Sequence, residues 1–496
     1  MSSPGSGDSG QRMRLTTDFG IPVPDDRDSQ TAGRDGPILL QDHFLTERTA
    51  QFVRERIPER IVHAKGAGAY GYFVVTADVS RWTKVAMLSG VGKRTPVMAR
   101  FSTVIGERGT PDSVRDARGF AVKFYTEEGN YDLVGSNTPV FFIRDPMKFL
   151  DLIHAQRRRP DSNLPDPETF WDFMSRSPET LNQIMILFSP FGTPASYRRM
   201  YGFSAHAFKW VNSQGGYVWV KYAFIPDEGV ANLTQDEVLR LAVEDPDHAA
   251  RDLWQCIAGG GEAAWRLQVQ VLTPEEAESC PFNPFDLTRE WLPEAIKPLT
   301  IGRLVLNRNP ANHFAEIEQA AFSPANMVPG VEPSPDRMLQ ARLFAYSDAQ
   351  RYRIGTNYAL LPVNAPRVTV SNDNRDGAMR FGSNFGGRPN YAPVGADRPP
   401  AASTAADPAD QISGTVVRAP VPLRPNDSDY TQPGQLYRRM TVDLCDALIA
   451  NLAASLKQVS TPIQERMIAQ FHTAEPEFGE RVARGLGPAT PVMAGG

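Results

Sequence analysis

An arginine, a tyrosine and a second arginine share one side of a predicted helix in the last third of the chain. Arg342 precedes Tyr346 by four residues, and Arg353 follows it by seven. At 3.6 residues per turn, these spacings place the three side chains on one stripe. Two guanidinium groups then flank one phenol, the setting expected where a phenol must ionise. Spacing alone, however, favours an exposed helix with a surface tyrosine and solvated arginines.

Ionisation of the phenol would require nearby positive charge. Free tyrosine titrates near pH 10, so holding it as a phenolate at pH 7 costs roughly 4 kcal/mol. A ferric ion together with a guanidinium can supply this free energy. We expect the helix to begin with Ser334 as its cap, Pro335 in its first position and Asp336 complementing its positive end.

A histidine lies in the segment at residues 60–71, which reads RIVHAKGAGAYG. Its glycines satisfy the G-x-G-x-x-G pattern, but β-branched and aromatic residues follow at 72–75, where a dinucleotide-binding loop needs a helix. The glycines therefore indicate a bend in a strand or a close backbone approach. Val62 and the small residues after His63 are expected to desolvate the imidazole and keep it neutral. Taken alone, a lone histidine is more often structural than catalytic.

A third cluster joins a predicted strand to an aromatic segment. Arg100, Ser102 and Val104 alternate along the strand, so they face one side of it. The aromatic segment follows at residues 134–145 and just beyond. On their own, its phenylalanines are interpreted as core residues: Phe141, Phe142 and Phe149.

Short runs of β-branched and aromatic residues, each bounded by Gly, Pro or Asn, dominate the first two thirds of the chain. Their spacing favours a closed antiparallel barrel over alternating βαβ units. Strands are predicted at residues 72–75, 97–104, 120–125, 140–143, 217–224, 265–272 and 301–307. Helices are predicted at 46–56, closed by Pro58, and as insertions at 167–187 and 234–258.

The chain is expected to divide into four parts. Residues 1–45 are predicted to form an extended arm, and 46–364 a barrel domain that includes the helix of Tyr346. Residues 365–433 are predicted to wrap around the protein or a neighbouring subunit, because they are rich in Pro, Gly and Asp. Residues 434–496 are predicted to be helical, with apolar residues at four-residue spacing at Met440, Leu444, Leu448 and Leu452.

The bulk composition argues against several classes of protein. The 52 Lys and Arg are scattered among 57 Asp and Glu, giving a net charge of -5 that argues against a nucleic-acid partner. The 3 cysteines lie far apart and form neither a disulfide framework nor a metal cluster, which fits a reducing, cytoplasmic location. Neither a secretory signal nor a membrane-spanning stretch is apparent.

Together these segments resemble the haem catalases, from LTTDFG at residues 15–20 to PVN at 362–364. The most specific matches are residues 60–71, RDARGFAVKFY at 115–125, LNRNP at 306–310 and RLFAY at 342–346. The resemblance implies an α+β fold: an eight-stranded antiparallel β-barrel with an N-terminal arm, a wrapping segment and C-terminal helices. It also implies haem b as the cofactor, dismutation of hydrogen peroxide to water and oxygen, and a homotetramer of the small-subunit type.

The same resemblance implies roles for individual residues. Tyr346 would bind the iron from below, as tyrosine does in catalases, and Arg342 would hydrogen-bond the phenolate. His63 would move a proton between the peroxide oxygens above the iron, oriented by Ser102. Contacts to the haem or its propionates are expected from Arg60, Val62, Arg100, Val104, Phe141, Phe149 and Arg353. Further channel or distal-pocket positions are Asp116, Phe142 and Gln156.

Ser136 departs from the family pattern at a catalytic position. The usual run is Gly-Asn-Asn-Thr-Pro, whereas this chain has GSNTP at residues 135–139. Serine is shorter than asparagine and presents no amide N–H to peroxide, so we expect slower catalysis. The alternatives are a haem peroxidase of the same fold, an enzyme that oxidises or rearranges an organic substrate, and a haem-binding protein with little chemistry.

A second departure concerns NADPH, which some relatives bind at the surface through Arg, His and Lys side chains. The corresponding positions here lack cations: Asn182, Phe191, Ile225 and Pro293. A nucleotide phosphate then has little to pair with, so NADPH is expected to be absent. His206 still matches a family position, although its surroundings differ from the usual pattern.

Overall fold

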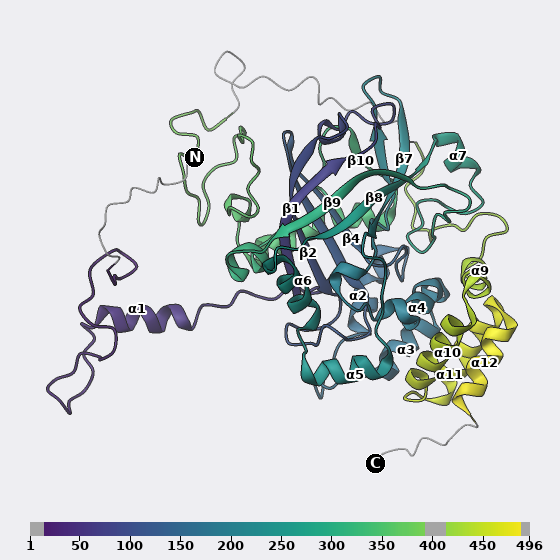
Figure 1. The fold of residues 1–496 in the computed structure, drawn as a ribbon, viewed down its shortest axis with the longest axis horizontal. Helices are drawn as coiled ribbons and strands as arrows, with labels where there is room; N and C mark the ends of the chain where they lie inside the picture. Colours follow the sequence, from purple (N-terminus) through teal and green to yellow (C-terminus); the bar gives the residue numbers. More distant parts are fainter. Residues whose placement is uncertain (1–13, 392–412, 488–496) are drawn as a thin grey trace. The chain divides into compact units, whose positions relative to one another are not determined.

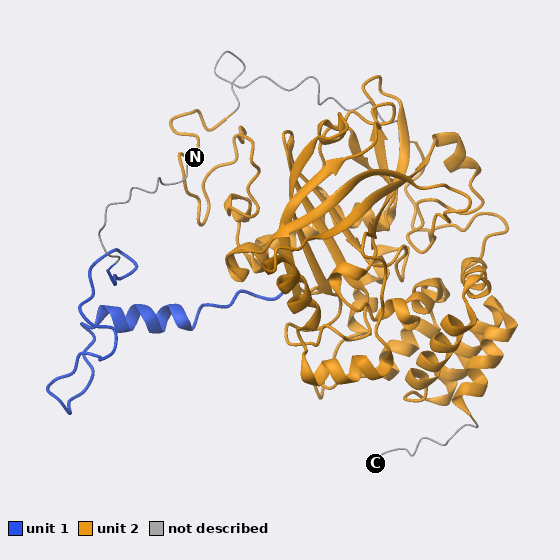
Figure 2. Cartoon of the chain, in the orientation of Figure 1, with its two compact units in different colours: residues 1–59 blue, residues 60–496 orange. Residues whose placement is uncertain are grey.

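The computed structural model describes residues 14–391 and 413–487 (Figure 1). The chain splits into two compact units, Met1–Glu59 and Arg60–Gly496 (Figure 2). Parts of the predicted arm, wrapping segment and C-terminal region lie outside the described residues, and the four-part division stays a prediction. In the described parts of the chain, no helix has both the length and the apolar character needed to cross a membrane.

The first unit contains helix α1, His43–Phe52. The side chain of Asp42 accepts a hydrogen bond from the Leu45 N–H at 3.1 Å and so caps the helix. The prediction of a helix at 46–56 closed by Pro58 was therefore wrong at both ends, because this cap starts the helix earlier and it ends at Phe52.

In the second unit, the described residues form one 10-stranded antiparallel sheet that closes on itself (Figure 1). Pairing of β7 with β8 closes a ring in the order β1, β2, β3, β4, β5, β7, β8, β9. The strands of this ring are β1 Gly66–Val75, β2 Arg94–Thr103, β3 Arg118–Thr126, β4 Gly129–Ser136, β5 Gly202–Phe203, β7 Tyr217–Pro226, β8 Ala263–Leu272 and β9 Leu299–Arg308. Strands β6, Phe208–Val211, and β10, Val331–Pro333, extend the sheet from β7. The predicted eight-stranded antiparallel barrel is confirmed.

One predicted strand is not formed, and β4 was missed, as were the short strands β5, β6 and β10. Residues 140–143 form irregular, bent backbone and not a strand, and the side chains of Phe142 and Ile143 are buried in a helical core; an apolar run alone does not distinguish burial in a sheet from burial against helices. Strand β4 was missed because its sequence, GNYDLVGS, is poor in residues that favour strands.

Alternation along the barrel strands separates a core face from an outer face. The barrel core takes apolar side chains such as Phe101, Phe120 and Leu133. The residues between them face outward: Arg100 and Ser102 on β2, Gly119 on β3, and Val134 and Ser136 on β4. Candidate site residues on three neighbouring strands therefore share the outer face of the barrel.

A second core joins the helical insertions to the C-terminal helices, which lie together in Figure 1. Trp171 and Leu181 from the insertions belong to the same buried cluster as Leu448 and Phe478. The inserted helices that contribute to this core are α2 Phe149–His154, α3 Pro167–Ser175 and α4 Leu181–Phe188. Helix α6, His248–Ala258, belongs to the barrel core instead, and α5, Gln235–Glu244, and α7, Pro274–Ser279, lie outside both cores. The C-terminal helices are α9 Thr431–Arg439, α10 Val442–Leu456, α11 Thr461–Ala474 and α12 Pro476–Leu486.

Helix α8, Arg337–Arg353, carries the predicted tyrosine. Asp336, not Ser334, caps it: its carboxylate accepts hydrogen bonds from the N–H groups of Met338 and Leu339 at 2.8 and 3.3 Å. The predicted start was wrong because this buried carboxylate captures two free N–H groups and leaves Pro335 outside the helix. His206 Nδ1 lies 2.5 Å from the other Asp336 oxygen and anchors the cap from β5–β6.

Candidate active site

His63 precedes β1 and has a left-handed backbone conformation, with φ of 68°. Few residues other than glycine adopt this conformation, and such strain gathers at functional sites. The His63 N–H donates to the Val104 carbonyl at 2.7 Å, which ties the bend to the end of β2. The ring Nδ1 then lies 2.9 Å from Ser102 Oγ on the outer face of that strand. The predicted orientation of His63 by Ser102 has this contact as its physical basis.

Gly119 completes the site, and sequence reasoning missed it. It lies opposite Ser102 on one side and opposite Ser136 on the other, so the three residues form one cross-strand row. A Cβ at Gly119 would lie 2.4 Å from Ser102 Oγ and 2.7 Å from His63 Nδ1. The imidazole and the hydroxyl therefore occupy the space that a side chain would need. The only signal in the sequence was a glycine immediately before the strand predicted at residues 120–125.

Gly119→Ala is expected to displace the imidazole from Ser102 and lower peroxide turnover on the order of 10²-fold, the effect of a misplacement near 1 Å. Oxygen release measured with an electrode on haem-saturated protein checks this. Gly90→Ala is the matched control, because no heavy atom lies within 4 Å of a Cβ there. Unchanged turnover in a folded Gly119→Ala variant would contradict the assigned packing.

Burial and three arginines keep the imidazole neutral. Desolvation lowers the pKa of His63 to about 3, and the positive charges of Arg100, Arg342 and Arg60 contribute to this shift. A neutral imidazole was expected from Val62 and the small residues after His63. The three arginine charges also favour the neutral form, and the sequence did not indicate them. At neutral pH the ring can accept a proton.

The phenol of Tyr346 is held by a cation on the same helix. Arg342 Nη2 donates to Tyr346 Oη at 2.5 Å and to the Val134 carbonyl on β4 at 3.1 Å. The guanidinium thereby links the phenol to the outer face of the barrel. The predicted flanking by Arg353 was wrong in part: the two turns between Arg353 and Tyr346 span about 10 Å, and Arg353 bonds Glu318 instead, at 3.1 Å.

Arg353 instead joins Arg60 and Arg100 in a buried cationic cluster around a single carboxylate. Arg60 Nη1 lies 3.6 Å from Glu318 Oε2, on the π-helix Phe314–Glu318. Burial lowers the pKa of Arg60 well below its ordinary value, as do the charges of Arg100 and Arg353. Among the described residues, Arg100 Nε has no hydrogen-bond partner. Three guanidinium groups around one carboxylate leave a site that favours further carboxylates.

The other residues predicted for the haem contacts and the channel lie in different parts of the structure. The rings of Phe141 and Phe149 stack with centroids 6.5 Å apart. Asp116 accepts hydrogen bonds from the N–H groups of Val104 and Ile105 at 2.7 and 2.8 Å. Val104 is joined to His63 by the backbone hydrogen bond at 2.7 Å. Phe142 lies in the helical core, and the Gln156 amide bonds the Leu152 carbonyl on α2.

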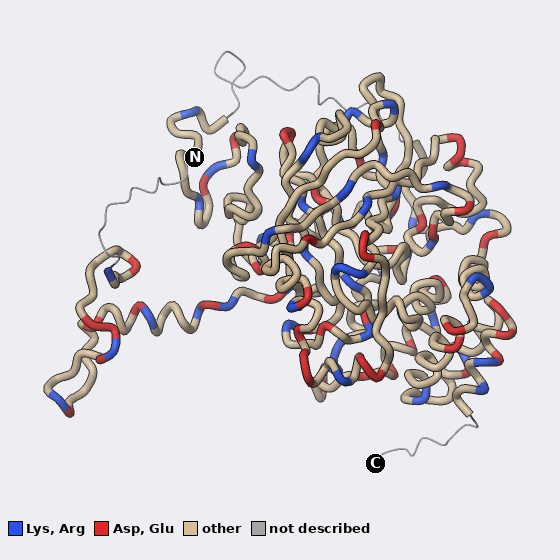
Figure 3. Tube along the Cα trace, viewed as in Figure 1, with Lys and Arg blue, Asp and Glu red and all other residues tan. Residues whose placement is uncertain are grey.

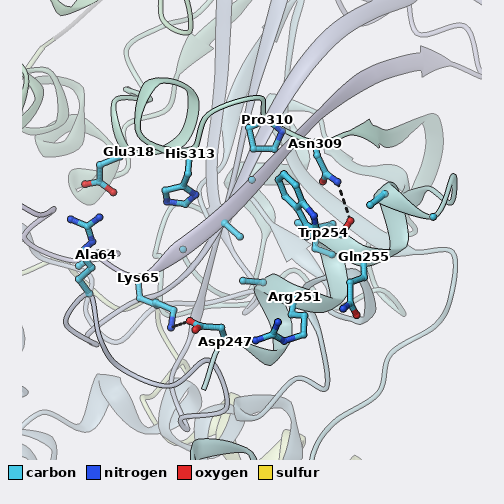
Figure 4. Close-up of a pocket in the computed structure, with 18 residues that line it drawn as sticks. Ala64, Lys65, Asp247, Arg251, Trp254, Gln255, Asn309, Pro310, His313 and Glu318 are labelled. Atoms are coloured by element: carbon cyan, nitrogen blue, oxygen red, sulfur yellow. Dashed lines mark hydrogen bonds and ion pairs between the residues drawn. The ribbon is translucent and has the colours of Figure 1, made fainter. Parts of the chain in front are cut away.

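A cavity of about 960 Å³ lies beside the cationic cluster (Figure 4). Glu318 and His313 lie on one wall, and the Lys65–Asp247 pair, with 2.6 Å between Nζ and Oδ1, lies on another. His63 and Tyr346 are not among the residues that line this cavity. Because Glu318 belongs to both features, the cavity adjoins the arginine cluster.

Ser136 differs from Ser102, the other polar residue of the row, in its hydrogen bonds. Its Oγ lies 3.1 Å from the Thr138 carbonyl and 3.2 Å from Thr138 Oγ1. Within the described contacts the hydroxyl bonds its own turn and not the imidazole. The position taken by asparagine in the family therefore contributes no donor toward His63 here.

Comparison with known proteins identifies the family. A profile described as Catalase matches residues 16–398, and one described as Catalase-related immune-responsive matches residues 424–486. The chain belongs to the catalase family. It is 52% identical over 474 residues to a catalase of Methanosarcina barkeri, covering 95% of this chain and 94% of that protein. It is 51% identical over 478 residues to catalase-A of Dictyostelium discoideum, covering 95% and 96%.

Solved catalases have the same fold. The structure of catalase A from Saccharomyces cerevisiae superposes with a TM-score of 0.91 at 41% sequence identity, and the match covers 95% of this chain and 99% of that one. Catalases carry haem, whose two carboxylates need cationic partners. The unpaired donor of Arg100 and the excess positive charge around Glu318 suit the two haem carboxylates. The residues present therefore fit a haem.

Proposed function

We propose that this chain decomposes hydrogen peroxide to water and oxygen at a haem held between Tyr346 and His63. Decomposition of peroxide is the activity of the catalase family, to which the chain belongs. The observation that supports this placement most strongly is the hydrogen bond of 2.5 Å from Arg342 Nη2 to Tyr346 Oη. A guanidinium at that distance stabilises a phenolate, the form in which tyrosine binds iron.

Haem, when bound, supplies the iron that binds peroxide and that takes up and returns two oxidising equivalents. The chain supplies the proton movements. The neutral His63 ring accepts a proton from one peroxide oxygen and delivers it to the other, so the O–O bond breaks as water leaves. Ser102 Oγ, 2.9 Å from Nδ1, fixes the ring orientation during both transfers.

The proposed cofactor is haem b, with its propionates paired to Arg60, Arg100 and Arg353. Val62, Val104, Phe141 and Phe149 are proposed to line the haem and the approach to it. An absorption spectrum and a pyridine haemochrome assay of purified protein test the haem type. Oxygen release on adding peroxide to the same sample tests the activity, and a haem-loaded sample that releases none would refute the proposal.

The proposed assembly is a cytoplasmic homotetramer with no nucleic-acid partner. Catalases are generally oligomeric, and the tetramer is the form expected from the resemblance. Blue and red segments are interspersed along the described chain, which argues against a continuous basic surface for nucleic acid (Figure 3). Light scattering of the purified protein gives the assembly size.

Ser136→Asn is expected to raise oxygen release from hydrogen peroxide about tenfold. Asparagine restores an amide N–H that serine lacks, and one oriented hydrogen bond worth about 1.4 kcal/mol in the transition state corresponds to that factor. Steady-state oxygen release, normalised to haem, checks it. Ser213→Asn, at an exposed turn, is the control. Equal rates for wild type and Ser136→Asn would count against the prediction.

We also propose that no NADPH is tightly held. Asn182 is buried and its amide is 3.4 Å from both the Thr288 carbonyl and Gln432 Oε1, while the rings of Phe191 and Tyr201 are 6.4 Å apart. These contacts replace cations with an amide and an aromatic surface, which give a phosphate no charge partner. Chromatography of nucleotide released by denaturing the protein should find far less than one NADPH per chain. A stoichiometric amount would refute this.

A further inference from the structure

Lys221 is a buried lysine on the outer side of the barrel wall. It lies on β7 between Val220 and Tyr222, whose side chains belong to the barrel core, so it faces outward, yet it is only 7% exposed. Its Nζ donates to the Arg289 carbonyl at 3.0 Å and lies 5.5 Å from the centre of the Trp291 ring. Within the part of the chain that the structure describes, Lys221 forms no ion pair. A buried charge of this kind requires compensation from charges farther away.

Hydrogen bonds join the strand around Lys221 to the cap of α8. Ser204 Oγ accepts a hydrogen bond from the Tyr222 N–H at 3.0 Å and donates to the His206 carbonyl at 2.8 Å. His206 Nδ1 lies 2.5 Å from the Asp336 carboxylate, the group that caps the helix. Lys221, His206 and Asp336 therefore belong to one buried unit, and this unit lies at the start of the helix that carries the proposed iron ligand.

The imidazole in this unit cannot supply the positive charge that Asp336 needs. Burial lowers the pKa of His206; the charge of Asp336 opposes this shift, and the charges of Arg342 and Lys221 add to it. The ring is therefore neutral at pH 7 and donates its Nδ1–H to the carboxylate. Burial opposes ionisation of Asp336, but the contact with His206 and two backbone N–H groups lowers its pKa. A neutral ring thus separates an anion, Asp336, from a cation, Lys221.

Three other acidic groups near Lys221 are already paired or resist ionisation. Asp286 lies 3.3 Å from an arginine. Burial raises the pKa of the Cys280 thiol and of the Glu290 carboxyl. Burial also lowers the pKa of Lys221 to about 8, and the charge of Asp336 is the strongest influence against this shift. Asp336 is therefore the carboxylate that the Lys221 charge mainly balances.

We propose that Lys221 is a positioning residue for the Tyr346 site: its buried charge balances Asp336, whose ionised carboxylate caps α8 and so fixes the place of the Arg342–Tyr346 pair. The inference rests on the proposed function. Below about pH 8 Lys221 is a cation and the cap holds. Above that pH it loses its proton, the Asp336 carboxylate has no balancing charge, and the first turn of α8 loosens. The site therefore has an alkaline limit that originates outside it.

Hydrogen exchange at the start of α8 tests the cap directly. Mass spectrometry follows the Met338 and Leu339 amides at pH 7 in haem-loaded wild type, Lys221→Met, Lys221→Arg and Lys457→Met. We expect exchange about fivefold faster in Lys221→Met, the effect of a weakened cap. Lys221→Arg keeps the charge and Lys457→Met changes an exposed lysine, so both should match wild type. Equal exchange in wild type and Lys221→Met would overturn the inference, as would equal loosening in Lys221→Met and Lys221→Arg.

The haem spectrum gives a second readout. In wild type the tyrosinate features should change with a midpoint near pH 8. Lys221→Met should lack this transition and show the alkaline spectrum of wild type already at pH 7. If Lys221→Met does not fold, wild type alone decides: a spectrum and an intrinsically corrected α8 exchange rate that stay constant from about pH 6 to about pH 10 would refute the inference. If haem-loaded wild type releases no oxygen from hydrogen peroxide, the proposed function fails, while the exchange result still decides the role of Lys221.

Discussion

Oxygen release from hydrogen peroxide falls on the order of 10⁴-fold in His63→Gln, the upper range for loss of a positioned general base. Glutamine keeps a polar side chain of similar length but cannot accept and return the peroxide proton at neutral pH. Initial rates on haem-saturated protein give the factor. His472→Gln, an exposed histidine on α11, should leave the rate unchanged. A loss below tenfold in a fully haem-loaded His63→Gln variant would contradict the role of the imidazole.

The low pKa of His63 gives this prediction a second signature. Burial and the nearby arginine charges lower that pKa to about 3, so the ring is neutral at any pH well above this value. Protonation removes the base, and therefore the wild-type rate should decline on the acid side only as the pH approaches the lowered pKa. A rate that halves near pH 6.5, where an ordinary histidine titrates, would show that the ring is solvated instead.

Tyr346→Phe is expected to lower oxygen release by at least about 10²-fold and to remove the tyrosinate features of the haem spectrum. The variant deletes the oxygen that Arg342 contacts at 2.5 Å, and with it the proposed anionic ligand of iron. A hydrogen bond to a charged group contributes about 1.5–3 kcal/mol, and 3 kcal/mol alone corresponds to about 10²-fold. Haem content measured in parallel separates weaker binding from slower chemistry.

The same helix offers a matched control for this variant. Tyr352 is 78% exposed on α8, so Tyr352→Phe should keep both the spectrum and the rate. If Tyr346→Phe retained a wild-type spectrum and rate, another residue would have to bind the iron. If both Tyr346→Phe and Tyr352→Phe lost haem, the cause would be a disturbed helix α8 and not the loss of the Tyr346 phenol oxygen.

Much of the barrel could be predicted because alternation and turn residues are local signals. The strands that contain residues 97–103 and 120–125 carry β-branched and aromatic side chains on the buried face, and they appear where expected. Strand β4 was missed because pairing with β3 along its whole length, not its own composition, stabilises it. The failed strand at 140–143 shows the converse: apolar residues can be buried against helices as well as in a sheet.

The sequence predicted several residues of the candidate site but not their arrangement. His63, Ser102 and Arg342 were proposed from the resemblance, and their contacts follow from strand register and helix phase, which the sequence gives only approximately. Gly119 matters because it lies between two serines on the neighbouring strands. Such pairing between distant residues cannot be read from the order of residues along the chain. Glu318 was missed because it reaches the arginines from a π-helix that no sequence pattern indicated.

A crystal structure of the haem-loaded protein tests the central claim most directly. We predict the Tyr346 phenolate oxygen bound to iron on one face of the porphyrin, and the His63 ring on the other face with Nδ1 still against Ser102. Both rings on the same face, or an iron bound by any residue other than Tyr346, would contradict the account.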